Sequence, residues 1–278
     1  FETRWNMKRV SSVKTLAGPA AASLCLLILL FYGALGDQGQ LTTDFSQSGL
    51  APSFAHPFGT DWMGRDMLTR TLFGMSRSLR VGLLAALISA AVALALGTVA
   101  AVGGKQADRA VSWIIDLFLG IPHILLVLLI SFALGGGMKG VVVGVAITHW
   151  PSLARVVRAE LLSIRSAPYL LASRQLGKGP LFLALRHMLP HLLPQLVVGT
   201  VLLFPHAILH ESAITFLGFG LSPHEPAMGI LLAESMDYLT SGMWWLAVFP
   251  GLSLLAGVLL FQYLGGWLQK RFTKEASI

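Results

Sequence analysis

The sequence predicts an all-α polytopic membrane protein whose single domain crosses the bilayer six times. Hydrophobic residues make up 55% of the 278 residues and charged residues only 12%, and the mean hydropathy is +0.72. A soluble domain carries about twice that share of charge. The apolar residues come in long blocks rather than in alternation, which argues against a β-barrel. The length suits six spans of about 20 residues each.

Six apolar segments justify this fold, and polar or glycine-rich turns separate them. The first follows a basic stretch and has no small-residue cleavage site after it, so we expect a retained anchor. Residues 1–15 and 269–278 would be cytoplasmic tails, and residues 1–6 are set aside because they precede a natural-looking Met-Lys-Arg start. The predicted spans lie near residues 16–35, 81–102, 111–134, 141–154, 192–210 and 244–264 of a transmembrane domain that covers residues 16–268.

Basic residues predict the orientation of the chain in the membrane. With both termini in the cytoplasm, 15 of the 20 Lys and Arg residues fall in cytoplasmic segments. The opposite loop, residues 211–243, has no Lys or Arg but four acidic residues. This is the distribution of the positive-inside rule. It also explains the net charge of +7 without a nucleic-acid partner, and the single Cys25 offers no disulfide or metal cluster.

A basic insert, residues 169–194, interrupts the apolar chain between the fourth and fifth predicted spans. Ala172–Leu176 is expected to form one helix that ends at Gly177, and Leu181–Met188 a second that begins after Gly179-Pro180. Such an elbow would lie along the cytoplasmic face, within a loop of residues 155–191. It either docks a soluble partner or rests as an amphipathic helix on lipid headgroups.

Several segments, which follow one another along the chain in the order that the family has, resemble the dipeptide, oligopeptide and nickel permeases of ABC importers. The insert is similar to their Glu-Ala-Ala loop, with Leu171-Ala172-Ser173 followed three residues later by Gly177. The remaining matches are His56-Pro57-Phe58-Gly59-Thr60-Asp61-Trp62-Met63-Gly64-Arg65-Asp66, Asp116 with Pro122, Glu211-Ser212-Ala213-Ile214-Thr215-Phe216-Leu217-Gly218-Phe219-Gly220 and Phe249-Pro250-Gly251. The resemblance extends over nearly the whole chain beyond residue 10.

The resemblance implies a type I ABC importer permease fold in a bacterial inner membrane. It implies a second, homologous permease subunit, two cytoplasmic ATPase subunits and an extracytoplasmic substrate-binding protein as partners. ATP and Mg²⁺ would be used by the ATPase subunits, since this chain has no phosphate-binding GxxxxGK[ST] loop and binds no cofactor of its own. The residues that would couple to the ATPase are Ala172, Ser173, Arg174, Gly177, Leu181 and Arg186.

Two features of the matched motifs have physical consequences. Leu171 stands where the family has Glu, so any polar contact of that Glu is lost, and the docking must depend on shape, on Gly177 and on basic residues. Gly177 is expected to adopt a positive φ. In the GTDxxGRD segment, Asp61 would cap a helix that starts at Trp62, and Asp66 would pair with the arginine four residues later.

The roles of the charged residues in these motifs are predicted to be structural. A structural or gating role is favoured over substrate contact for four of them, which are Asp61, Arg65, Asp66 and Asp116. Asp116 lies about two turns from the cytoplasmic loop, so it would alternatively bond to a loop arginine.

Ionisable residues at membrane depth mark a candidate substrate pathway, since they tend to face a bundle interior. These residues are Asp116, His123, His149, His206, His210 and Glu211. His206 and His210 are one helical turn apart and share a face, so they are candidate transient ligands of a borderline cation such as Ni²⁺. The alternative is that both hydrogen-bond to neighbouring helices. Glu211 is placed with them in the pathway.

The predicted function is therefore a permease subunit that imports nickel or a metal chelate, with di- or oligopeptides as the alternative cargo. A proton-driven cation transporter and a membrane-embedded enzyme are the other two hypotheses. The enzyme is disfavoured because the sequence has no HExxH, no GxSxG and no cysteine cluster.

Overall fold

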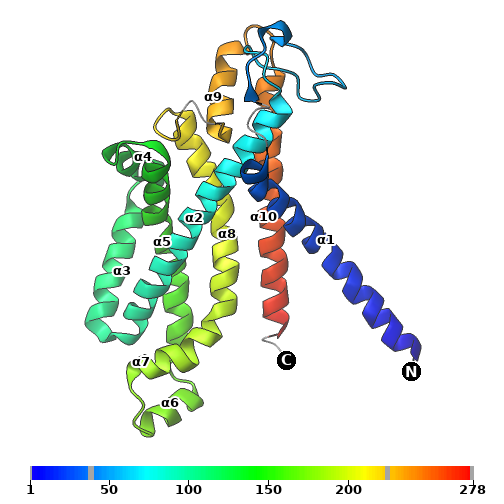
Figure 1. Cartoon of the computed structure of the whole chain (residues 1–278). Coiled ribbons are helices and arrows are strands. Elements are labelled where there is room, and N and C mark those ends of the chain that lie inside the picture. Colours follow the sequence, from blue (N-terminus) through cyan, green and yellow to red (C-terminus); the bar gives the residue numbers. More distant parts are fainter. Residues whose placement is uncertain (1, 37–40, 223–225, 276–278) are drawn as a thin grey trace.

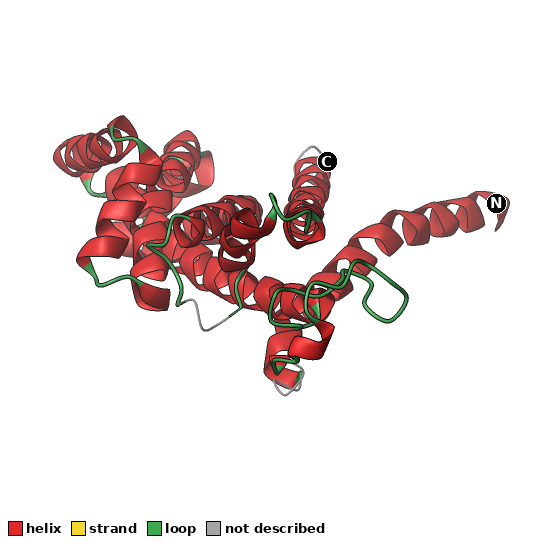
Figure 2. Ribbon diagram, turned by 90° about the horizontal axis from the view of Figure 1, so that it is seen from above, coloured by secondary structure: helices red, strands yellow, loops and turns green. Residues whose placement is uncertain are grey.

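The computed structural model describes residues 2–36, 41–222 and 226–275, and within these ranges the chain is all-helical, with one isolated backbone pairing between Thr60 and Asp66 (Figures 1 and 2). The α-helices are α1 (Glu2–Leu35), α2 (Met67–Val102), α3 (Gly104–Gly120), α4 (His123–Ala133), α5 (Gly137–Ile164), α6 (Pro168–Gln175), α7 (Pro180–Leu183), α8 (Leu189–Phe216), α9 (Met228–Tyr238) and α10 (Trp245–Glu275). A 3₁₀ turn, η2 (Phe45–Gln47), and a π-helical turn, η3 (Ala184–Met188), complete the described elements.

Five segments of the described chain are long and apolar enough to cross a membrane, and a bent pair of helices brings the number to six. The five are Leu16–Leu35, Met67–Val102, Gly137–Ile164, Leu181–Phe216 and Trp245–Phe272. The prediction of an all-α protein with about six spans is thereby confirmed.

The third predicted span, residues 111–134, is not one straight helix. The chain bends by 94° between α3 and α4. Ile121 is extended, with φ −92° and ψ 137°, because the ring of Pro122 excludes the helical conformation from the residue before it. The single span was predicted because the hydropathy is continuous across both helices. Pro122, which separates them, is the sequence signal for the bend.

Helix boundaries differ from the predictions wherever charged residues lie inside helices. α2 begins at Met67 rather than near residue 81, and it includes Arg70, which is buried. α5 continues to Ile164, so the predicted coupling loop, 155–191, starts too early. α8 continues to Phe216, which removes the first residues from the predicted loop 211–243.

The elbow at 169–194 also differs from its prediction in one respect. Its first helix, α6, begins earlier, at Pro168, and ends before Gly177 as expected. The second predicted helix has no break after Met188, because η3 joins α7 directly to α8. The elbow is therefore rigidly continuous with the span that follows it.

Small residues allow α2 to lie close to α5 and α8 at the centre of the bundle. Ala85, Ala86 and Ala93 of α2 are buried, and Ser89 Oγ donates a hydrogen bond of 2.7 Å to the Ala146 carbonyl of α5. A Cβ at Gly97 would lie 2.6 Å from Val157 Cγ1. Close helix packing through small residues is typical of membrane interiors.

Figure 1 shows the arrangement along the bundle axis. One end, called the α6 end here, carries α6 and α7 together with the N-terminal end of α1 and the C-terminal end of α10. The opposite end, called the α9 end, carries α9 and the loop 41–66. α1 leans away from the bundle in both views and packs on α2 and α10.

We expect the substitution Gly229→Ala to destabilise the α9 end. A Cβ at Gly229 would overlap the Ser212 carbonyl oxygen and lie 2.7 Å from Thr215 Cβ, and backbone atoms of α8 cannot easily move away. Overpacking of this kind costs about 1–3 kcal/mol. The measurement is the free energy of unfolding in detergent micelles.

Gly266→Ala in α10 is the matched control, because no atom of the described residues lies within 4 Å of its added Cβ. Alanine should be neutral or favourable there, by up to about 1 kcal/mol. Equal stability of the two variants would contradict the packing of α9 on α8.

Candidate functional site

The α9 end is organised around a buried carboxylate, Asp61, in the loop before α2. Its side chain is 1% exposed and accepts hydrogen bonds from the backbone N–H groups of Met63 and Arg65 at 2.8 and 2.9 Å. The guanidinium groups of Arg65 and Arg70 each donate to it at 2.7 Å. Arg70 also donates to Glu234 of α9 at 2.8 Å. One arginine of α2 therefore joins the loop to α9.

Two predictions were made for this segment, a helix cap by Asp61 and an ion pair between Asp66 and Arg70, and both are wrong. Asp61 does not cap a helix at Trp62, because α2 begins only at Met67. Asp66 is the cap, and it accepts from the Thr69 N–H at 2.8 Å. Asp66 also pairs with His56 at 3.0 Å rather than with Arg70, whose guanidinium group turns to Asp61. A tertiary contact has replaced the local i,i+4 pair.

The α6 end presents an exposed elbow. Gly177 has φ +74°, as predicted, and no described atom lies within 4 Å of where its Cβ would be. Ser173 Oγ lies 3.3 Å from His187 Nε2, which connects α6 to η3. The predicted coupling residues Ala172, Arg174, Gly177, Leu181 and Arg186 are exposed, and Ser173 is half-buried.

Apolar side chains on the elbow are exposed to an unusual degree. Leu176 is 78% exposed and Leu181 69%. Leu171, at the position of the family's Glu, is also exposed, as are Leu185 and Phe182. An apolar patch with basic residues beside it is typical of a protein interaction surface.

Asp116 and Glu211 lie apart from any shared site. Asp116 accepts a hydrogen bond of 2.7 Å from Arg155 of α5, and both side chains are exposed. This is the arginine pairing that the sequence analysis gave as its alternative. Glu211 is fully buried inside α8, where the hydroxyl groups of Thr215 and Ser212 donate to it at 3.1 and 3.2 Å. It does not line the cavity described next, and its place in the substrate pathway stays a prediction.

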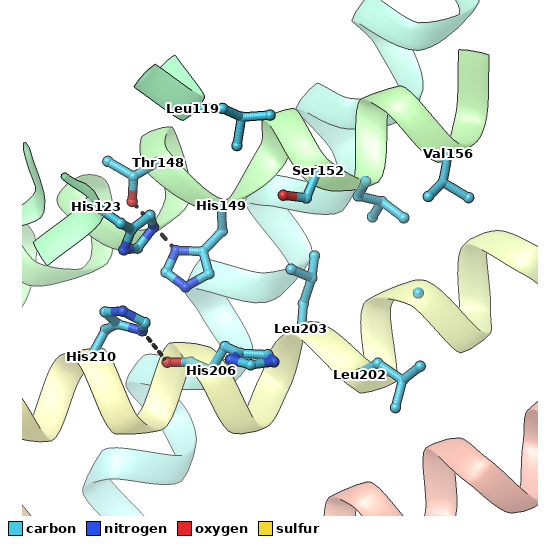
Figure 3. A pocket seen from close by; sticks show the side chains of 12 residues that line it. Leu119, His123, Thr148, His149, Ser152, Val156, Leu202, Leu203, His206 and His210 are labelled. Atoms are coloured by element: carbon cyan, nitrogen blue, oxygen red, sulfur yellow. Dashed lines mark hydrogen bonds between the residues drawn. The ribbon is translucent and has the colours of Figure 1, made fainter. Parts of the chain in front are cut away.

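A cavity of about 460 Å³ opens between α3, α4, α5 and α8. Figure 3 shows that four histidines line it, together with Thr148, Ser152 and leucines. His123 begins α4 at the bend, His149 lies near the middle of α5, and His206 and His210 lie on α8. The predicted pair does border a cavity inside the bundle, but two further histidines from other helices share it.

The structure groups these histidines differently from the sequence prediction. His123, His149 and His210 form a cluster whose nearest nitrogens all lie within 4.8 Å of one another. His206 lies one helical turn before His210 in α8 and is exposed. His123 and His149 were predicted to lie at membrane depth, but their sequence spacing gave no reason to associate them with His210. Only the bend at Pro122 brings His123 to the side of α5.

These observations define a class: a polytopic helical membrane protein with an open, histidine-bearing cavity between its helices and an exposed elbow at one end. A family model described as "Binding-protein-dependent transport system inner membrane component" matches residues 93–274, which is more than half of the chain. The chain belongs to this family of transport components, and it is the permease subunit of an ABC importer.

Relatives of the chain agree with this assignment. The "Dipeptide transport system permease protein DppC" of Bacillus subtilis is 33% identical over 255 residues, which cover 90% of this chain and 80% of the relative. A Brucella suis protein, provisionally assigned by its name as a peptide permease, is 36% identical over 238 residues, covering 84% of this chain and 78% of its own. The names of these relatives give no support to nickel as the cargo.

A solved structure matches the fold. It is an inward-facing conformation of the MetNI methionine ABC transporter, with a TM-score of 0.57 and 22% identity. The match covers 72% of this chain and 93% of that one. The predicted ABC permease fold is thereby confirmed.

We expect Asp61→Asn to destabilise the protein strongly. The change would leave Arg70, which is 4% exposed, with a single charged partner, and breaking a buried ion pair costs about 3–5 kcal/mol. Asp116→Asn is the matched control, because its pair with Arg155 is exposed and contributes less than about 1 kcal/mol. Chemical denaturation in micelles measures both free energies of unfolding, and a smaller loss for Asp61→Asn than for Asp116→Asn would contradict a stabilising role of the buried Asp61–Arg70 pair.

Proposed function

We propose that this chain is one of two homologous permease subunits of an ATP-driven importer of di- or oligopeptides. The observation that carries the proposal is the 33% identity, over 90% of the chain, to a dipeptide permease. The Brucella relative points the same way. The importer would lie in a bacterial inner membrane with both termini of this chain in the cytoplasm, in keeping with the basic residues at the α6 end.

In this proposal the elbow of α6 and α7 docks into a cytoplasmic ATPase subunit, which binds ATP and Mg²⁺. The exposed side chains of Leu176 and Leu181 would be covered there, and Arg174 and Arg186 would meet acidic residues of the partner. With Leu171 in place of the family's Glu, apolar contact and shape would supply most of the affinity.

The α9 end would receive the substrate-binding protein. The Asp61–Arg70–Glu234 network holds the loop 41–66 and α9 as one unit, so a docked protein would meet a pre-formed surface. ATP binding would bring the two ATPase subunits together, and their movement would pass through the elbow to open the bundle toward the α9 end. Hydrolysis would reverse this, as a rigid-body motion of packed helices.

A deletion strain tests the cargo. Restoring this gene to a strain that retains the partner subunits should raise uptake of a radiolabelled dipeptide at least tenfold, whereas uptake of ⁶³Ni²⁺ without a chelator should stay near background. The reverse result, nickel uptake without dipeptide uptake, would contradict the peptide proposal and favour the metal cargo first predicted from the sequence.

The coupling role of the elbow is tested by Gly177→Val. A β-branched residue is strained at φ +74°, so the turn between α6 and α7 should change shape. We expect dipeptide uptake and ATPase co-purification each to fall at least fivefold.

Gly179→Ala is the matched control two residues away, since its φ is ordinary and no described atom lies within 4 Å of the added Cβ. It should retain uptake near the wild-type level. If Gly177→Val imports normally, the elbow does not transmit the motion.

A further inference from the structure

We infer that His123, His149 and His210 form a binding site for one borderline divalent transition-metal ion inside the cavity between α3, α4, α5 and α8. The three imidazoles come from α4, α5 and α8, and their ring centroids are 4.4, 4.4 and 5.0 Å apart. This site goes beyond the proposed import of peptides and does not depend on it.

The hydrogen bonds of the cluster leave metal-binding lone pairs free. His149 Nδ1 lies 2.8 Å from the Val145 carbonyl, and His210 Nδ1 lies 2.7 Å from the His206 carbonyl. Since a carbonyl can only accept, each Nδ1 carries the proton and each Nε2 keeps its lone pair. Metal-bound histidines are held in this way, by a second hydrogen bond from the other ring nitrogen.

Two nitrogens of the cluster have no hydrogen-bond partner in the described part of the chain. They are His149 Nε2 and His123 Nδ1, and both atoms are buried. His149 as a whole is only 8% exposed. Leaving a buried polar atom without a partner is unfavourable, and a metal ion bound between the rings would give both nitrogens a partner.

The geometry requires only a small closure. With metal–nitrogen bonds of about 2.0–2.1 Å in a tetrahedral site, the nitrogens stand about 3.3 Å apart. The observed nitrogens are all within 4.8 Å, so they must approach by at most about 1.5 Å. Rotation of the rings can supply this, because the cavity of about 460 Å³ leaves room beside them.

The ligand set selects the class of ion. Imidazole nitrogens suit Ni²⁺, Zn²⁺ and Cu²⁺, whereas Mg²⁺ and Ca²⁺ require oxygen ligands. Three protein ligands leave at least one position for water or for a donor atom of a chelating molecule. The ion would therefore be exchangeable, and it would arrive either free or as a chelate.

Equilibrium dialysis of ⁶³Ni²⁺ against the full-length chain in nanodiscs, purified with a tag that contains no histidine, measures the site. The wild type should bind about one ion per chain, and excess Mg²⁺ should not compete. His149→Ala should weaken binding at least tenfold. X-ray absorption of the bound wild type should report three imidazole ligands, a result that does not depend on any variant being folded.

His206→Ala distinguishes this site from the His206/His210 pair predicted from the sequence. It removes an imidazole from the same cavity but keeps the backbone carbonyl that holds His210, so affinity should change less than threefold. His187→Ala, at the α6 end, is the control for general loss of a histidine.

Three outcomes would overturn the inference: equal binding by wild type and the triple His123→Ala/His149→Ala/His210→Ala variant, an absorption spectrum without three imidazoles, or a tenfold loss in His206→Ala. Repeating the dialysis with Ni²⁺ preloaded with one equivalent of free histidine, which leaves positions open for the three imidazoles, separates the sources, because a site for chelates binds this form and a site for free ions excludes it. Failure of dipeptide uptake would leave these results unaffected.

Discussion

The close approach of α2 to α5 and α8 is the constraint on which the rest of the structure depends. Two neighbouring helices can lie against the same central helix only if its side chains are small, as Ala93 and Gly97 are. Apolar burial contributes little driving force between helices in lipid, so van der Waals contact at short range must supply it. The polar contact of Ser89 with the backbone of α5 adds to this attraction without exposing a polar group. Because α5 and α8 are both fixed on α2, the cavity between them has a defined width.

The α9 end differs from the centre of the bundle because it contains buried charged side chains. Arg70 is nearly covered, and its guanidinium group donates hydrogen bonds to Asp61 and to Glu234 of α9. Asp61 also accepts hydrogen bonds from the Arg65 side chain and from two backbone N–H groups. A network of this kind is favourable only when it is complete. It ties a loop that has little regular structure to two helices, so the loop keeps one shape without a large apolar core of its own.

Much of the fold follows from the sequence because hydrophobic length and the distribution of basic residues are strong signals in membrane proteins. The boundaries of the helices do not follow from the sequence in this way. A charged residue such as Arg70 is assigned to a loop as long as its buried partners are unknown. The same limit applies to the cavity. His206 and His210 are one turn apart and could be associated by spacing alone, whereas His123 joins His149 and His210 only through the 94° bend at Pro122. Contacts between residues distant in sequence require the tertiary structure.

The cavity and the elbow are connected by the two helices that carry the histidines. His149 lies on α5, which runs without interruption to Ile164, about 22 Å further along at 1.5 Å per residue, and α6 follows after three residues. His210 lies on α8, which is continuous with α7 through η3. The two ends of the elbow are thus attached to the two walls of the cavity. Because neither helix is broken in between, the displacement of the elbow that the proposed coupling requires would be transmitted along both helices to the walls that carry His149 and His210.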